Sequence, residues 1–245
     1  MCSKEKYKLT EEINFDNCTL YRIQATKDFE TIAGTVHKGD LGGWIESEFN
    51  LSQEDNCWVF DEAKVYQMAQ VNDNAIVAGE AIVKGYAKVF NDAAVCEYAL
   101  LDDKANIGEY AKIYGNAVVL GKSDIKGCSE IYDFALVRGQ NYITGTSKIL
   151  GEIDGKDIKI EDSLISQESH VSGESIITNS QIIGKVEIAN KSLIVNSHIN
   201  STCLNIAYIN QEILNQRMIL SDPSSLADTQ TNLTDILQNA LFKEI

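Results

Sequence analysis

Aliphatic residues occur at every sixth position between residues 59 and 149. They are Val59, Val65, Val71, Val77, Val83, Val89, Val95, Leu101, Ile107, Ile113, Val119, Ile125, Ile131, Val137, Ile143 and Ile149. A second series, offset by four positions, runs from Ala63 to Ser147 and consists of alanine and serine except for Asn141. A single helix would need a period of 3.6 residues and a single strand a period of two. A period of six instead predicts short strands separated by turns and repeated in a coil, which is a solenoid.

Each position of the repeat has an expected role. The aliphatic residue would point inward, with its neighbours outward by the alternation of a strand. The small residue would also point inward, close to a corner. Gly, Asn and Asp are frequent two positions after the aliphatic residue, as at Asp73, Gly79 and Asn91, and they tolerate the positive φ of tight corners. Three such units would close a triangular coil, and stacked coils would pair as parallel strands.

This repeat resembles the hexapeptide repeat of left-handed parallel β-helices. The resemblance implies an all-β, left-handed parallel β-helix, and only the resemblance gives the handedness, because nearly all parallel crossovers are right-handed. We expect an N-terminal cap at 1–58, a regular β-helix at 59–150, an irregular continuation at 151–207 and a tail at 208–245. A short amphipathic helix is expected in the tail, where apolar residues follow helical spacing. These residues are Leu233, Ile236, Leu237, Ala240 and Leu241.

Motifs near the start of the repeat carry a closer resemblance. The segments 38–47, 50–53, 56–59 and 63–66 resemble bacterial and prophage hexapeptide-repeat proteins of the YdcK-like type, over roughly residues 20 to 120. That family is generally assigned to the acyltransferases by analogy of fold. The resemblance implies a homotrimer, a coenzyme A slot between neighbouring prisms and a histidine base. The candidate catalytic histidines are His170 and His37.

One outward column of the predicted prism is apolar. Residues 18 positions apart should stack, and the column consists of Ile82, Leu100, Val118 and Leu136, with Leu120 beside it. A solvent-facing apolar ladder favours a partner. The partner is either a second copy in a homotrimer or the C-terminal helix folded back on the prism.

Basic residues gather at the corner that follows this face. They are Lys84, Lys104, Lys122 and Arg138, with Tyr86 among them. Stacked like charges repel each other, and an anionic ligand would relieve the repulsion. The alternative is neutralisation by the neighbouring carboxylates Asp102, Asp103, Glu109 and Asp124.

Composition narrows the function classes. The formal charge of −15 argues against binding to nucleic acid. We find no signal-peptide pattern and no apolar run that would span a bilayer, so a cytoplasmic protein without a membrane partner is expected. The six cysteines lack paired spacing, which favours reduced thiols. No His, Cys and Asp cluster has the spacing of metal ligands, so neither a metal nor a resident cofactor is expected.

Three functions are consistent with these observations. The first is an oligomeric binding protein that holds an anionic small molecule, such as a nucleotide, at clefts between subunits, which would suit sequestration in a phage or prophage context. The second is an acyl-CoA-dependent acyltransferase that uses His170 or His37. The third is an acidic scaffold that docks proteins or mimics DNA.

Overall fold

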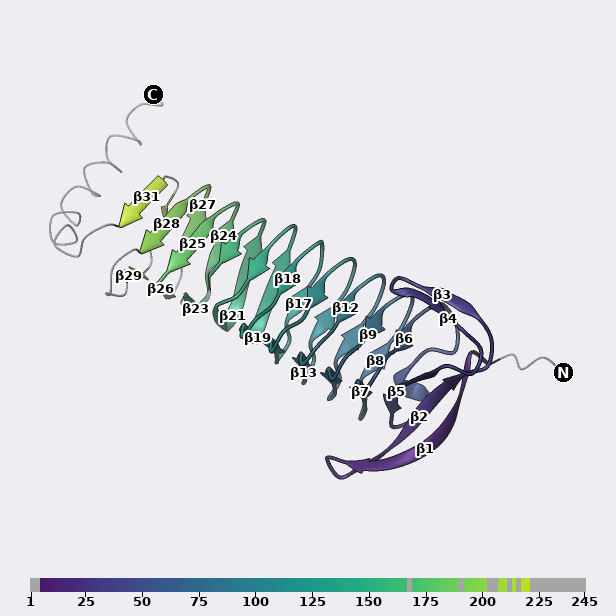
Figure 1. Ribbon diagram of the computed structural model, residues 1–245. Coiled ribbons are helices and arrows are strands. Elements are labelled where there is room, and N and C mark those ends of the chain that lie inside the picture. The colour runs from purple at the N-terminus through teal and green to yellow at the C-terminus, as the bar shows by residue number, and fades with distance from the viewer. Residues whose placement is uncertain are drawn as a thin grey trace.

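The chain forms a parallel β-solenoid in the computed structural model, with three flat faces along a long prism (Figure 1). The strands of each face pair in parallel with the strands of the coils above and below. This confirms the predicted all-β parallel β-helix, while its handedness stays a prediction from the resemblance. The structure describes residues 5–166, 169–189 and 192–201, together with the strands at 207–210, 213–214 and 217–220.

Each face is named here by its most distinctive side chains. The ladder face contains β7 (Lys64–Val65), β10 (Ile82–Val83), β13 (Leu100–Leu101), β16 (Val118–Val119), the first parts of β19 (Leu136–Thr144) and β21 (Glu152–Glu161), β23 (His170–Gly173), β26 (Val186–Ala189) and β29 (Ala207–Asn210). The polar face contains β8 (Gln70–Val71), β11 (Lys88–Val89), β14 (Asn106–Ile107), β17 (Asp124–Ile125), the later parts of β19 and β21, β24 (Ile176–Thr178), β27 (Leu193–Val195) and β30 (Ile213–Leu214). The tyrosine face contains β6 (Trp58–Val59), β9 (Ile76–Val77), β12 (Ala94–Val95), β15 (Lys112–Ile113), β18 (Glu130–Ile131), β20 (Lys148–Ile149), β22 (Leu164–Ile165), β25 (Gln181–Gly184), β28 (His198–Ser201) and β31 (Arg217–Leu220).

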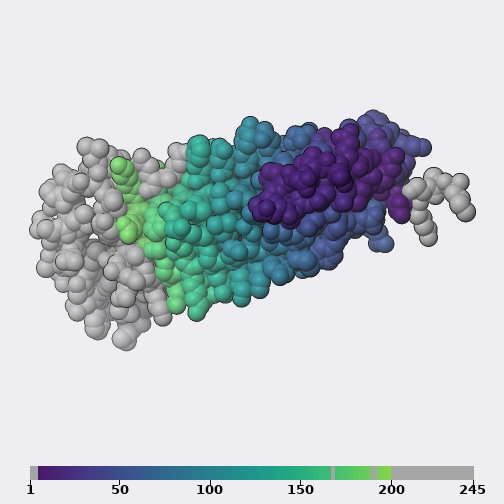
Figure 2. Space-filling view, turned by 90° about the horizontal axis from the view of Figure 1, so that it is seen from below, coloured from purple at the N-terminus to yellow at the C-terminus, as the bar shows by residue number. Residues whose placement is uncertain are grey.

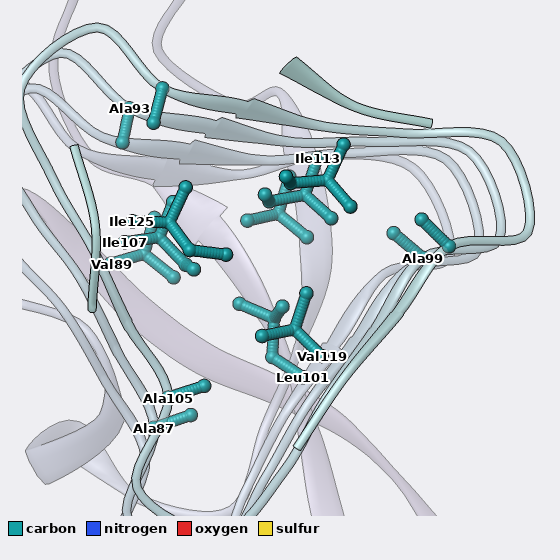
Figure 3. Close-up of a cluster of buried hydrophobic side chains, with 14 of the residues drawn as sticks. Ala87, Val89, Ala93, Ala99, Leu101, Ala105, Ile107, Ile113, Val119 and Ile125 are labelled. Atoms are coloured by element: carbon teal, nitrogen blue, oxygen red, sulfur yellow. The ribbon is translucent and has the colours of Figure 1, made fainter. Parts of the chain in front are cut away.

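The six-residue series forms the core. Every aliphatic position of the series from Val59 to Ile149 is completely buried, and so is every small position from Ala63 to Ser147. Figure 3 shows the arrangement within the prism, with alanines such as Ala99 at the corners and larger residues such as Ile113 along the faces. The buried Asn141 donates from its amide nitrogen to Ser123 Oγ at 3.2 Å and to the Arg138 carbonyl at 2.8 Å.

Corner carboxylates and amides hold successive coils together. At these positions, non-glycine residues such as Asp61 and Glu97 adopt a positive φ. The side chain accepts a hydrogen bond from the backbone N–H of the corner residue one coil further on, as from Asp61 to Gly79 and from Glu97 to Gly115, both at 3.0 Å. Gly79 is required at its position, because a Cβ there would lie 2.9 Å from the Cα of Glu97.

Coils in the C-terminal half are shorter. Val83 pairs with Leu101, 18 positions later, whereas Ile165 pairs with Ile182, 17 positions later. In the longer coils the N–H of the small corner residue donates to a carbonyl three positions earlier, as from Ala87 to Lys84. The shortened corners lose this bond and use serine hydroxyls instead. The N–H of Ser180 donates to Ser163 Oγ at 3.1 Å, and the N–H of Ser197 donates to Ser180 Oγ at 3.0 Å.

The coil begins before the six-residue series does. Strand β5 (Leu41–Ile45) pairs in parallel with β7, so that Trp44 lies beside Lys64 and Ile45 beside Val65. Leu51 forms a parallel bridge with Val71 in the same first coil. The segment 1–58, which was expected to be a cap, therefore also supplies strands of the prism. A single turn of 3-10 helix, η1 (Glu48–Asn50), precedes Leu51.

The rest of this segment covers the open end. Strands β1 (Tyr7–Phe15) and β2 (Cys18–Ala25) form an antiparallel hairpin, and β2 pairs with β5, which protects the exposed edge. A second hairpin, β3 (Phe29–Thr31) and β4 (Gly34–Val36), follows. The rings of Tyr7 and Phe29 pack edge-on against the buried Trp58 and close the core.

The expected C-terminal helix lies outside the described residues. Within the described part, no helix has the length and the apolar character needed to span a membrane.

Candidate functional site

The apolar ladder exists as predicted. Ile82, Leu100, Val118 and Leu136 are direct neighbours on successive parallel strands of the ladder face. All four are partly exposed, and so is Leu120. Below Leu136 the same column becomes polar and continues through Glu152, His170 and Glu187.

The N-terminal hairpin covers the first part of the ladder face (Figure 2). The sequence had suggested only a second copy or the C-terminal helix as the partner of this face. Leu20, Trp44 and Tyr66 form a buried cluster there, and Phe15 and Ile82 pack against it. At the hairpin tip, Asp16 accepts a hydrogen bond from the Tyr66 hydroxyl at 2.8 Å and lies 3.4 Å from the Lys84 ammonium. The hydrogen bond from Tyr66, followed by the one from Lys84, lowers the pKa of Asp16. Only the rungs from Leu100 onward are free of this hairpin cluster.

Two of the four basic residues that were predicted to bind an anion already form ion pairs with carboxylates of the chain. Lys84 lies between Asp16 and Asp102, the second at 3.7 Å from its nitrogen. Arg138 contacts Glu152 and Asp154, each at 2.8 Å. The neutralisation considered as the alternative thus applies to Lys84 through Asp102, but Asp103 has a different role. Its carboxylate accepts the backbone N–H of Gly121.

Lys104 and Lys122 have no such partner. Both are exposed, and neither forms an ion pair within 4.0 Å among the residues that the structure describes. They occupy equivalent corner positions on successive coils, and the Lys104 ammonium lies 5.9 Å from the centre of the Tyr86 ring. Tyr86 itself is 59% exposed. We call Tyr86, Lys104 and Lys122 the basic corner.

His170 contacts a second group of charges lower on the ladder face. Its Nδ1 lies 3.3 Å from Glu152, the carboxylate that also contacts Arg138. Two residues that were predicted for different roles, His170 as a base and Arg138 as an anion ligand, therefore share one carboxylate. The other candidate, His37, lies between β4 and β5, with a side chain 70% exposed and 4.0 Å from Asp28. It is not part of the ladder face.

The tyrosine face carries a second apolar column, which the sequence reasoning missed. It was missed because only the outward residue before each buried position was compared between faces. The column after the buried position contains Phe60, Ala78, Cys96, Tyr114, Tyr132 and Leu150. The rings of Tyr114 and Tyr132 stack with centroids 5.1 Å apart. Burial, followed by the charge of Glu130, raises the pKa of Tyr114 to about 12.

A small polar pocket of about 270 Å³ lies at the corner between the polar and tyrosine faces. It opens where the corner at Asp162 is one residue shorter than the corner at Gly145 above it. Its lining includes Thr146, Lys148 and Gln181. Asp162 already accepts hydrogen bonds from the N–H and hydroxyl of Thr146. Within the described ranges, no group of three or more His, Cys, Asp or Glu could hold a metal ion.

Comparison with known proteins agrees with the fold. A curated protein of Escherichia coli (strain K12), described as "Uncharacterized acetyltransferase YdcK", is 35% identical over 91 residues. The matched region is 33% of this chain and 26% of the relative. The fold and this match fit a hexapeptide-repeat, acyltransferase-like protein. The chain thus matches about a quarter of the relative's length, and no family model matches it.

Proposed function

We propose that the protein is an oligomeric binding protein that holds an anionic small molecule at the basic corner. The observation that carries this proposal is the pair Lys104 and Lys122, which are stacked on successive coils without ion-pair partners in the described structure. Successive strands lie roughly 5 Å apart, so the two ammonium groups repel each other. An anion between them would remove this repulsion.

The neighbouring side chains suit a ligand with a planar ring. Charge-assisted hydrogen bonds from two lysines would hold a phosphate or carboxylate group. The exposed ring of Tyr86 lies one coil above Lys104 and offers a stacking surface. A nucleotide combines both features. The other carboxylates of this acidic protein would disfavour a long polyanion.

Native mass spectrometry of the purified protein, and calorimetric titration with ADP as the probe, test this proposal. Lys104→Ala with Lys122→Ala should weaken ADP binding at least tenfold and leave the melting temperature equal or higher, because a like-charge contact is removed. Lys112→Ala with Lys159→Ala, two exposed lysines away from the basic corner, is the matched control and should bind ADP as the wild type does. Equal binding by both double variants would refute a site at the basic corner.

Acyl transfer is the second candidate, and the contact between His170 and Glu152 supports it. A carboxylate at Nδ1 orients the imidazole ring and leaves Nε2 available to accept a proton from an acyl acceptor. No resident cofactor is needed, since acyl-CoA would be a substrate. Release of free CoA from acetyl-CoA in the presence of amine or hydroxyl acceptors would detect the activity. His170→Gln should abolish it and His37→Gln should not. Turnover that survives His170→Gln would reject this role for His170.

A further inference from the structure

A completely buried lysine contacts a completely buried cysteine at the N-terminal end of the prism. Lys6 is 1% exposed and Cys57 0%. The Nζ atom of Lys6 lies 3.3 Å from the Sγ atom of Cys57. A lysine is almost never buried without a charged partner. Within the described residues, however, Lys6 forms no ion pair within 4.0 Å, and its polar partners are the thiol and backbone carbonyls.

Backbone contacts hold the two side chains in place. The backbone N–H of Lys6 donates to Gln53 Oε1 at 2.8 Å, and the N–H of Thr26 donates to the Lys6 carbonyl at 3.0 Å. The Lys6 Nζ donates to the carbonyls of Cys57 at 2.9 Å and of Glu54 at 3.0 Å. The nitrogen therefore stays beside the sulfur as long as the end of the prism is folded.

The protonation state that fits this site is a neutral amine beside a neutral thiol. Burial lowers the pKa of Lys6 and raises the pKa of Cys57, because a charge is disfavoured away from water. A neutral amine has two N–H groups, which match its two shortest carbonyl contacts. The carbonyl of Asp55 is further away, at 3.4 Å. The amine thus keeps a lone pair for the side on which the thiol lies, and this lone pair makes the nitrogen reactive.

We propose that Lys6 and Cys57 form a covalent N–O–S bridge when the protein reacts with dioxygen. The thiol S–H bond and one amine N–H bond break, and an S–O bond and an O–N bond form to one oxygen atom. The second oxygen atom takes both hydrogens and leaves as water. Sulfur and nitrogen are each oxidised by two electrons, and dioxygen is reduced by four. No further reactant is needed.

The surroundings favour this product over the other oxidation products of a cysteine. A disulfide needs a second thiol, and the cysteines in the described part of the chain are all free. Sulfinic acid would place a charge in a buried site, where the Val71 carbonyl lies 3.5 Å from the sulfur. A direct S–N bond would require a closer approach of the two atoms than a bridge with one oxygen between them. The N–O–S bridge is uncharged, and its nitrogen keeps one N–H for a carbonyl.

The bridge would fasten the N-terminal hairpin to the first coil. Lys6 directly precedes β1, and Cys57 directly precedes β6. The hairpin of β1 and β2 protects the edge of β5 and covers the first part of the ladder face. A link between residues 51 positions apart also restricts the unfolded chain, which stabilises the folded state. This modification site is independent of the anion site at the basic corner.

Peptide mass spectrometry of the full-length wild type tests the bridge. One sample is kept without oxygen and the other in air-saturated buffer, and both are alkylated with iodoacetamide in denaturant before proteolysis. In the aerobic sample we expect a linked pair of peptides that contains Lys6 and Cys57 and has gained one oxygen and lost two hydrogens. Dithiothreitol should return the two separate peptides. Cys18 and Cys96 are internal controls and should be alkylated equally in both samples.

Thermal melting gives a second measurement. Aerobic wild type should melt at a higher temperature than the same sample after dithiothreitol. Cys57→Ser removes the sulfur at nearly constant size and should melt equally under both conditions. Cys96→Ser is the matched control and should keep the difference that wild type shows.

Three results would overturn the inference. One is a Cys57 that stays fully alkylated in the aerobic sample. Another is a Cys57 that carries sulfinic acid while the peptide of Lys6 is unmodified. The last is a linked pair without the additional oxygen, because the product would then be a direct S–N bond. Since the mass measurement uses wild type, it does not depend on whether a variant folds.

Discussion

Two buried serines should respond in opposite directions to the same substitution. The Ser129 hydroxyl is buried and has no hydrogen-bond partner among the described residues. Ser180 occupies a shortened corner, where its hydroxyl donates to the Thr178 carbonyl at 2.8 Å and accepts the N–H of Ser197 at 3.0 Å. Ser129→Ala removes a group without a partner, whereas Ser180→Ala removes two hydrogen bonds to the backbone, although the Thr178 carbonyl keeps the one from the Asn196 N–H.

The magnitudes follow from the cost of unpaired polar groups. A buried group without a partner costs about 1–3 kcal/mol, so Ser129→Ala should stabilise the fold by about 1 kcal/mol. Ser180→Ala removes the hydrogen bond to the Thr178 carbonyl and the one from the Ser197 N–H, which together should cost about 2–3 kcal/mol. For a chain of this size 1 kcal/mol moves the melting temperature by about 2–4 °C. The expected shifts are therefore about 2–4 °C upward for Ser129→Ala and about 5–10 °C downward for Ser180→Ala.

Thermal melting followed by circular dichroism measures both shifts. Hydrogen exchange should locate the loss in Ser180→Ala at the N–H of Ser197, because unfolding of a solenoid need not be two-state. Ser123→Ala is an internal comparison, since Ser123 donates to the Leu120 carbonyl and accepts from Asn141. It should fall between the other two. If Ser129→Ala and Ser180→Ala lowered the melting temperature equally, the serine ladder would not explain why serine occupies the shortened corners.

Two further expectations concern the core and the hairpin. Val95 is completely buried between Val77 and Ile113. In denaturant titrations, Val95→Asp should therefore lower the free energy of unfolding by about 5 kcal/mol or more and Val95→Ala by about 2 kcal/mol. Equal midpoints for the two variants would contradict a dry core at this position. The hydrogen bond from Tyr66, then the one from Lys84, lowers the pKa of Asp16 below its ordinary value of 3.8 in the folded state. The contact between the hairpin and the ladder face should therefore be complete above about pH 4 and should be lost as the pH falls through the lowered pKa. Hydrogen exchange of β1 measured across this range should show the loss in wild type and a flat profile in Asp16→Asn; an identical pH dependence in both would assign the transition to another group.

The fold could be predicted because aliphatic residues recur at every sixth position without exception. Each aliphatic residue at the six-residue period meets the same constraint in every coil, so the core positions from Val59 to Ile149 could be read individually. The corners were predictable for the same reason, since residues such as Asp61 and Gly79 tolerate a positive φ. The role of the serines after residue 160 could not be predicted from the sequence, because it depends on a backbone hydrogen bond that is lost when a corner is one residue shorter. The serine hydroxyl that replaces the lost acceptor belongs to a residue 17 positions earlier in the chain.

The candidate site was harder to predict because it depends on contacts outside the repeat. Nothing in the repeat indicates that Asp16, 68 positions before Lys84, reaches that lysine. The hairpin was expected only as part of a cap, so its path along the ladder face could not be inferred. The contact between Arg138 and Glu152 also could not be inferred from the 18-residue spacing, because Glu152 lies on a shortened coil and pairs with Leu136 after only 16 positions. The tyrosine column was readable from the sequence, and comparing both outward columns of every face would have found it.

The corner carboxylates have a consequence for how such a chain can change its length. At one corner the residues alternate as Asp61, Gly79, Glu97, Gly115 and Asp133, and each of the first two acids caps the glycine that follows it. Gln67, Gly85, Asp103 and Gly121 alternate in the same way at a second corner. Duplicating a single coil would place two acids or two glycines in succession and leave either a repulsion or an uncapped N–H. The smallest insertion that preserves the alternation at these two corners is a pair of coils. The third corner is different, because Asp73, Asn91 and Glu109 follow one another there and each accepts the N–H of the next corner residue, so it would accommodate a single added coil.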